Sequence, residues 1–106
     1  MMGKYRVLFR IVYRCNYPQR NGRMVWFRRF IRLPFPPYKG LWIERDEKRE
    51  DGSDWIEIHI NDKANIYWDL RKKRFEVCCE KYELRSPEDE TDLIEKMVRC
   101  GWKQES

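Results

Sequence analysis

The chain has 106 residues, of which 39% are charged and 15% aromatic, and its formal net charge is +5 at pH 7. This length predicts one domain, residues 1–106, with one hydrophobic core, and the aromatic content excludes a disordered tail. The sequence contains neither a long apolar run nor a signal-peptide pattern, so we predict no membrane span, no export and a cytoplasmic protein.

Charge is divided unevenly along the chain. Residues 1–43 hold ten Lys or Arg and no Asp or Glu, whereas residues 44–106 hold thirteen basic and eighteen acidic residues. The formal charges of the two parts are therefore +10 and −5. This asymmetry predicts either an anionic partner for the first part or ion pairs between the two parts.

The first two predicted strands, residues 4–14 and 23–33, form a hairpin around the turn-rich loop 15–22. Both strands alternate with a period of two, so one face of the hairpin is apolar and the other combines arginine with aromatic side chains. The candidate binding residues on this mixed face, which also carries Leu8, Val12 and Met24, are Arg6, Arg10, Arg14, Trp26, Arg28, Phe30 and Arg32. Arg20 adds a further positive charge in the loop.

Proline residues between positions 34 and 37 end the hairpin, because proline cannot donate a hydrogen bond to a sheet. Alternation then predicts four further strands, at residues 40–47, 55–60, 66–70 and 74–84. Ser86 and Pro87 predict the start of a helix over Pro87–Cys100, and Gly101 predicts its end. We therefore predict an α+β domain, with an antiparallel sheet of about six strands in meander order, twisted or partly closed, and one C-terminal helix packed on one face.

The residues that usually carry catalysis or metal binding are sparse. His59 is the single histidine, and its spacing from serine, cysteine and acidic residues matches no catalytic dyad or triad. The four cysteines include no CxxC pair, and the neighbours Cys78 and Cys79 point to opposite faces of a strand, so we predict reduced structural thiols. We therefore predict no catalytic residue, metal or cofactor, and favour a non-enzymatic protein.

The mixed face together with Arg20 predicts a binding module for single-stranded DNA or RNA, in which arginines hold phosphates and aromatic rings stack on bases. In a second interpretation the arginines pair with acids of later strands, namely Glu57, Glu76 and Glu80. A third interpretation is a protein-interaction module, inhibitor or adaptor, or a homodimer that buries the same aromatic and arginine face.

The segment Trp26–Leu33, with the sequence WFRRFIRL, resembles the second-strand pattern of pleckstrin-homology domains. A sheet followed by one C-terminal helix is also similar to that fold. The resemblance implies a phosphoinositide headgroup site near the first hairpin, with Arg14 and Arg28 at the matching basic positions.

Overall fold

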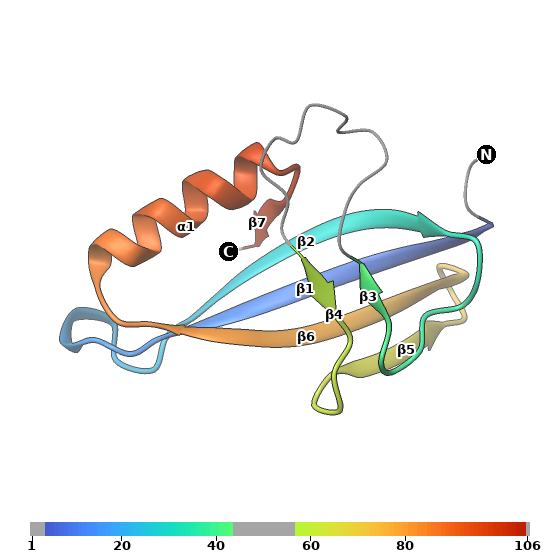
Figure 1. The fold of residues 1–106 in the computed structure, drawn as a ribbon, viewed down its shortest axis with the longest axis horizontal. Helices are drawn as coiled ribbons and strands as arrows, with labels where there is room; N and C mark the ends of the chain where they lie inside the picture. Colours follow the sequence, from blue (N-terminus) through green and yellow to red (C-terminus); the bar gives the residue numbers. More distant parts are fainter. Residues whose placement is uncertain (1–3, 44–56, 106) are drawn as a thin grey trace.

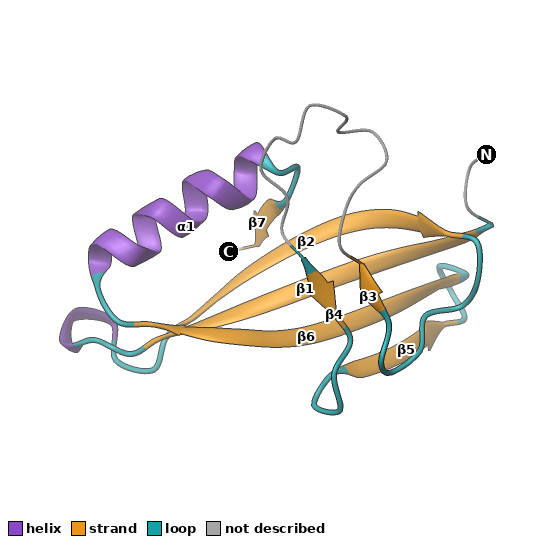
Figure 2. Ribbon diagram, viewed as in Figure 1, coloured by secondary structure: helices purple, strands orange, loops and turns teal. Residues whose placement is uncertain are grey.

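The computed structural model describes residues 4–43 and 57–105, apart from the side chains of residues 80–82. Its largest element is a five-stranded sheet in the order β5-β6-β1-β2-β7 (Figures 1 and 2). The strands are β1 (Tyr5–Cys15), β2 (Met24–Leu33), β5 (Asn65–Asp69), β6 (Arg74–Leu84) and β7 (Lys103–Glu105).

Four smaller elements complete the described part of the chain. The short strands β3 (Trp42–Ile43) and β4 (Ile58–His59) pair with each other in a separate sheet, and the helix α1 (Pro87–Arg99) precedes β7. A single 3₁₀ turn, η1 (Pro18–Arg20), lies in the loop between β1 and β2. Figure 1 shows α1, β3 and β4 on the same side of the large sheet.

Within the described residues the fold is α+β with one α-helix, as predicted, but the predicted antiparallel meander is wrong because the sheet is mixed. β1 is antiparallel to β2 and parallel to β6, so it lies in the middle of the sheet. The meander prediction placed each strand beside its predecessor in sequence. Instead, the chain leaves β2, crosses one face of the sheet through β3 and β4, and returns on the free side of β1 with the β5–β6 hairpin.

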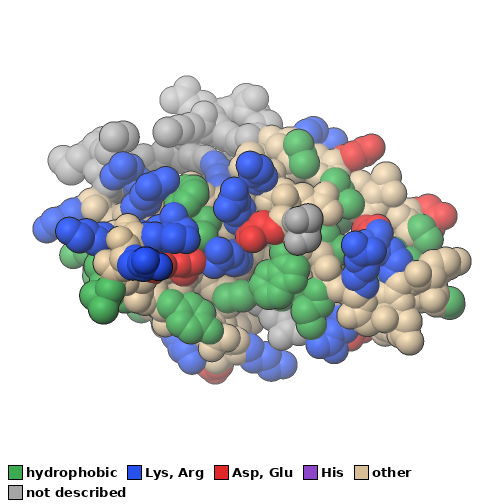
Figure 3. All heavy atoms as spheres, turned by 180° about the vertical axis from the view of Figure 1, so that it is seen from behind, with side chains coloured by type: hydrophobic (Ala, Val, Ile, Leu, Met, Phe, Trp, Pro, Cys, Tyr) green, Lys and Arg blue, Asp and Glu red, His purple; other side chains and the backbone are tan. Residues whose placement is uncertain are grey.

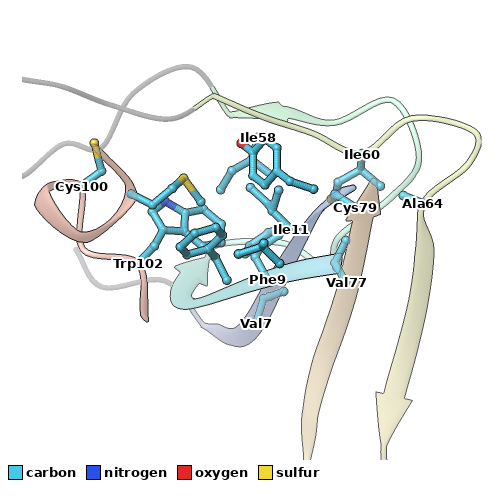
Figure 4. Close-up of a cluster of buried hydrophobic side chains, with 14 of the residues drawn as sticks. Val7, Phe9, Ile11, Ile58, Ile60, Ala64, Val77, Cys79, Cys100 and Trp102 are labelled. Atoms are coloured by element: carbon cyan, nitrogen blue, oxygen red, sulfur yellow. The ribbon is translucent and has the colours of Figure 1, made fainter. Parts of the chain in front are cut away.

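The hydrophobic core lies between the large sheet and the layer formed by α1, β3 and β4 (Figure 4). The odd positions of β1 supply Val7, Phe9 and Ile11 to it, which confirms the apolar face predicted for the hairpin. Ile58 and Trp102 close the core from the opposite layer. The alternation of β1 therefore decides which face of the sheet is buried.

Both ends of α1 follow the prediction. The Ser86 hydroxyl oxygen accepts a hydrogen bond from the backbone N–H of Asp89 at 3.1 Å, which caps the first turn. At the other end Gly101 has a φ of 89°, and the N–H of Trp102 donates to the carbonyl of Met97 at 2.9 Å. This left-handed glycine turns the chain back toward the sheet.

The strand β7 was not predicted, because three residues are too few to show a period. It pairs antiparallel with β2, and Trp26 lies opposite Glu105. The predicted strands 40–47 and 55–60 are described only in part, since residues 44–56 lie outside the described ranges. The two-residue strands β3 and β4 occupy the parts that are described.

The corrected strand order predicts a pattern of amide hydrogen exchange. In the observed sheet β1 has a hydrogen-bonded neighbour on each side, so its amides should exchange slowest, whereas those of the outer strands β5 and β7 should exchange faster. In a meander β1 would be an outer strand, with every second amide free. Exchange of the β1 amides at the same rate as those of β5 would contradict the mixed sheet.

Candidate ligand-binding face

One face of the five-stranded sheet points away from the core, and we call it the open face. The strand registers place the even positions of β1 on it, together with their neighbours on the other four strands. Its residues are Arg6, Leu8, Arg10, Val12, Arg14, Met24, Trp26, Arg28, Phe30, Arg32, Asn65, Tyr67, Asp69, Arg74, Glu76, Cys78, Glu83, Lys103 and Glu105. Figure 3, seen from behind, shows Lys and Arg side chains gathered beside hydrophobic ones.

The open face brings together seven of the eight residues that the sequence predicted for binding. The seven are Arg6, Arg10, Arg14, Trp26, Arg28, Phe30 and Arg32. The eighth, Arg20, lies in η1 and binds a different part of the molecule. The register also adds Arg74 and Lys103, which the hairpin alone could not reveal because they come from later strands.

Arg10, at the centre of the face, is held by two carboxylates. Its Nη1 lies 2.6 Å from Glu76 Oε1, and its Nε lies 3.1 Å from Glu105 Oε1. Burial lowers the pKa of Arg10, but the hydrogen bonds to the two carboxylates outweigh this effect and leave the pKa raised. The predicted ion pair between a hairpin arginine and Glu76 is therefore confirmed, and the arginine is Arg10.

Four other arginines of the open face differ from Arg10 in this respect. Among the described side chains, no carboxylate lies within ion-pair distance of Arg6, Arg14, Arg28 or Arg32. Glu83 is opposite Arg14 in the register, where it accepts a hydrogen bond from the Asn16 amide at 3.3 Å. The acids therefore neutralise the centre of the open face more completely than its ends.

Glu57 and Glu80 are the two other acids that the sequence predicted as partners of the hairpin arginines. Glu57 immediately precedes β4, and its carboxylate accepts a hydrogen bond from Trp42 Nε1 at 3.3 Å. The ring of Trp42 stacks on His59, with centroids 4.5 Å apart. The side chain of Glu80 lies outside the described residues. Of the three predicted acidic partners, Glu76 is thus the one for which the structure describes an ion pair with a hairpin arginine.

The aromatic residues of the open face differ in how they could meet a ligand. Phe30 is 39% exposed, but the guanidinium carbons of Arg6 and Arg74 lie 4.1 and 5.0 Å from its ring centroid. Its ring therefore makes cation–π contacts with two guanidinium groups. Tyr67 is 57% exposed and was not predicted, because its face is known only once β5 is placed beside β6.

Arg20 belongs to a buried polar cluster that fastens the β1–β2 loop to α1. Its Nη1 lies 3.0 Å from Glu90 Oε2, and the Cys15 thiol donates to Glu90 Oε1 at 3.0 Å. Burial raises the pKa of Cys15, and the Glu90 carboxylate raises it further. A thiol held in its neutral form is a poor nucleophile, so this cluster has a structural role.

The four cysteines, all within the described residues, form no disulfide, and Cys15, Cys79 and Cys100 are buried. Within residues 4–43 and 57–105, no group of three or more His, Cys, Asp or Glu side chains could hold a metal ion. In the same ranges no helix is long and apolar enough to cross a membrane.

No protein-family model, curated protein or solved structure matches this chain. The resemblance to pleckstrin-homology domains therefore rests on the sequence pattern of Trp26–Leu33, since β7 follows the helix in this fold.

The central ion pairs predict a loss of stability when Glu76 is neutralised. Glu76→Gln leaves Arg10 with one carboxylate partner and also removes the partner 3.9 Å from Arg74 Nε. The side chains are partly exposed, so we expect the free energy of unfolding to fall by about 1–2 kcal/mol in urea denaturation. The exposed control Glu95→Gln should change it by less than about 0.5 kcal/mol. Equal losses in both variants would contradict a stabilising role for the pair.

The Cys15–Glu90 contact predicts a loss of stability at high pH. Because the pKa of Cys15 is raised in the folded protein, the folded state favours the neutral thiol. The contribution of the neutral thiol to stability is complete below the pKa of Cys in the unfolded chain, about 8.5. It is lost as pH rises through the folded pKa. Between pH 8 and 10 the wild-type protein, kept reduced, should therefore lose unfolding free energy faster than Cys15→Ser. If the unfolding free energies of the two proteins fell equally with pH, the Cys15 thiol would not be the group responsible.

Proposed function

We propose that the open face binds single-stranded DNA or RNA, and that the protein is a binding module without catalytic activity. One observation carries the proposal: arginines from β1, β2 and β6 share an uncovered sheet face with exposed aromatic rings, and described acids hold only the central arginine closely. Arginines provide the charge that attracts phosphates, and exposed rings offer surfaces for bases.

The spacing along β1 supports an extended ligand. Arg6, Arg10 and Arg14 are four residues apart, which corresponds to about 13 Å per step at a strand rise of about 3.3 Å per residue. The row therefore covers about 26 Å, which suits a site of several nucleotides. Arg28 and Arg32 on β2 widen the same row.

The width of the sheet favours single strands over duplexes. Five strands at a spacing of about 4.8 Å extend over about 19 Å, whereas the major groove of B-DNA is about 12 Å wide. The whole face therefore does not fit into the groove. An unpaired strand can lie across the sheet and place its bases on side chains such as Trp26 and Tyr67.

A protein partner, or a second copy of the chain, is the competing proposal. Met24, Phe30 and Tyr67 are exposed large hydrophobic residues of the open face, and aromatic and arginine residues are enriched at the centres of protein interfaces. The two proposals differ in their dependence on salt, because contacts with phosphates release counterions and an aromatic interface does not.

The proposed function predicts salt-dependent binding of single strands. In fluorescence anisotropy, mixed-sequence oligonucleotides should bind at low salt, and the logarithm of the binding constant should fall with log salt at a slope of roughly −2 to −3, as for three or four phosphate contacts. Duplexes of equal length should bind more weakly. Arg14→Glu/Arg28→Glu should weaken binding at least about tenfold, because it reverses two charges of the open face.

The matched control is Arg23→Glu/Arg85→Glu, which makes the same change of charge at two exposed positions that lie just outside the strands β2 and β6. It should bind nearly as well as the wild type. Absence of binding at low salt would contradict the nucleic-acid proposal. A concentration-dependent dimer that is lost in Arg14→Glu/Arg28→Glu would instead support the protein interface.

A further inference from the structure

The pairing of β1 with β2 places arginine opposite arginine twice. Arg6 faces Arg32, and Arg10 faces Arg28, in the antiparallel register. Side chains directly opposite each other in a sheet are close neighbours, and like charges in such pairs are destabilising. Each pair therefore needs compensating negative charge.

The two pairs are compensated differently. The Arg10–Arg28 pair has Glu76 and Glu105, both bound to Arg10. For the Arg6–Arg32 pair, no described carboxylate lies within ion-pair distance, and Arg6 lies over the ring of Phe30 instead. Both Arg6 and Arg32 are exposed. Among the described side chains, the second pair thus has no carboxylate of the kind that compensates the first.

A third guanidinium adds to the charge at this end of the sheet. The guanidinium carbon of Arg74 lies 5.0 Å from the centroid of the same Phe30 ring, so this ring holds Arg6 and Arg74 together. Arg74 Nε is buried without a hydrogen-bond partner among the described residues, and Glu76 Oε2 is 3.9 Å away.

Another acid at this end of the sheet, Asp69, is held mainly by the turn between β5 and β6. Asp69 is opposite Arg74 in the register, but its Oδ1 accepts the backbone N–H groups of Arg71 and Lys72 at 2.9 and 3.0 Å. These hydrogen bonds lower the pKa of Asp69 and keep its carboxylate at the turn between β5 and β6. Glu76 is occupied by Arg10.

We propose that Arg6, Arg32 and Arg74 form a binding site for a phosphate monoester. A monoester carries a charge of about −1.5 to −2 at pH 7, whereas a phosphodiester within a strand carries one negative charge, so three guanidiniums favour the monoester. Arginine also presents its donors in a planar fork that matches phosphate oxygens. If the open face binds single-stranded nucleic acid, as proposed above, the monoester is the terminal phosphate of the strand. The protein then binds the ends of single strands.

The test compares oligonucleotides of one sequence that carry a 5′-phosphate, a 3′-phosphate or hydroxyl groups at both ends. The wild-type protein should bind one of the phosphorylated forms about tenfold more tightly than the hydroxyl form, the effect of a charge-assisted contact. Arg32→Gln should lose this preference. Arg32 is exposed and makes no described ion pair, so its replacement leaves the fold intact. The exposed control Arg85→Gln, at the other end of β6, should keep the preference.

The outcomes separate this inference from the proposed function. Equal binding of all three oligonucleotides would overturn the monoester site and leave nucleic-acid binding intact. Binding of inorganic phosphate, followed by NMR and lost in Arg32→Gln, without any oligonucleotide binding would support the site and overturn its assignment to a strand end. Binding of neither probe would overturn both proposals.

Discussion

The position of β1 between β2 and β6 is the constraint on which the rest of the structure depends. Its odd side chains form the centre of the core, and on its other face Leu8 and Val12 are also buried, outside the core cluster. Apolar side chains that are buried on both sides of a strand are typical of the interior of a sheet, where side chains of neighbouring strands shield them. The return of the chain to the free side of β1 with β6 provides this shielding for Leu8 and Val12.

The same pairing determines the electrostatics of the open face. Because β1 and β2 bring arginine opposite arginine, the centre of the sheet needs acids from elsewhere, and they come from β6 and the C-terminal strand β7. Glu76 and Glu105 are distant in sequence from Arg10 and reach it only through the strand order. Among the described side chains, the positive charge of the first part of the chain is thus compensated at the centre of the face and exceeds the negative charge at the end near Arg6.

Local patterns predicted the elements well. The boundaries of β1, β2, β6 and α1 agree with the sequence to within one or two residues, because alternation, prolines and caps act over short distances. Strand order was wrong, although a signal was present: Val7–Phe9 and Ile11–Tyr13 are apolar without interruption, as expected for a strand buried on both faces. Arg20 was grouped with the other arginines by charge alone, whereas the fold pairs it with Glu90.

The sequence by itself determined which residues form strands and the helix, which face of the hairpin is apolar, and that arginine and aromatic residues share the other face. These features follow from the period of each element and from the turns between them. Only the tertiary structure decided that β6 is parallel to β1, that Arg10 is held by two acids, and that Arg6 and Arg74 meet at Phe30. Contacts between distant segments depend on how the layers pack, and a local pattern carries no information about its partner strand.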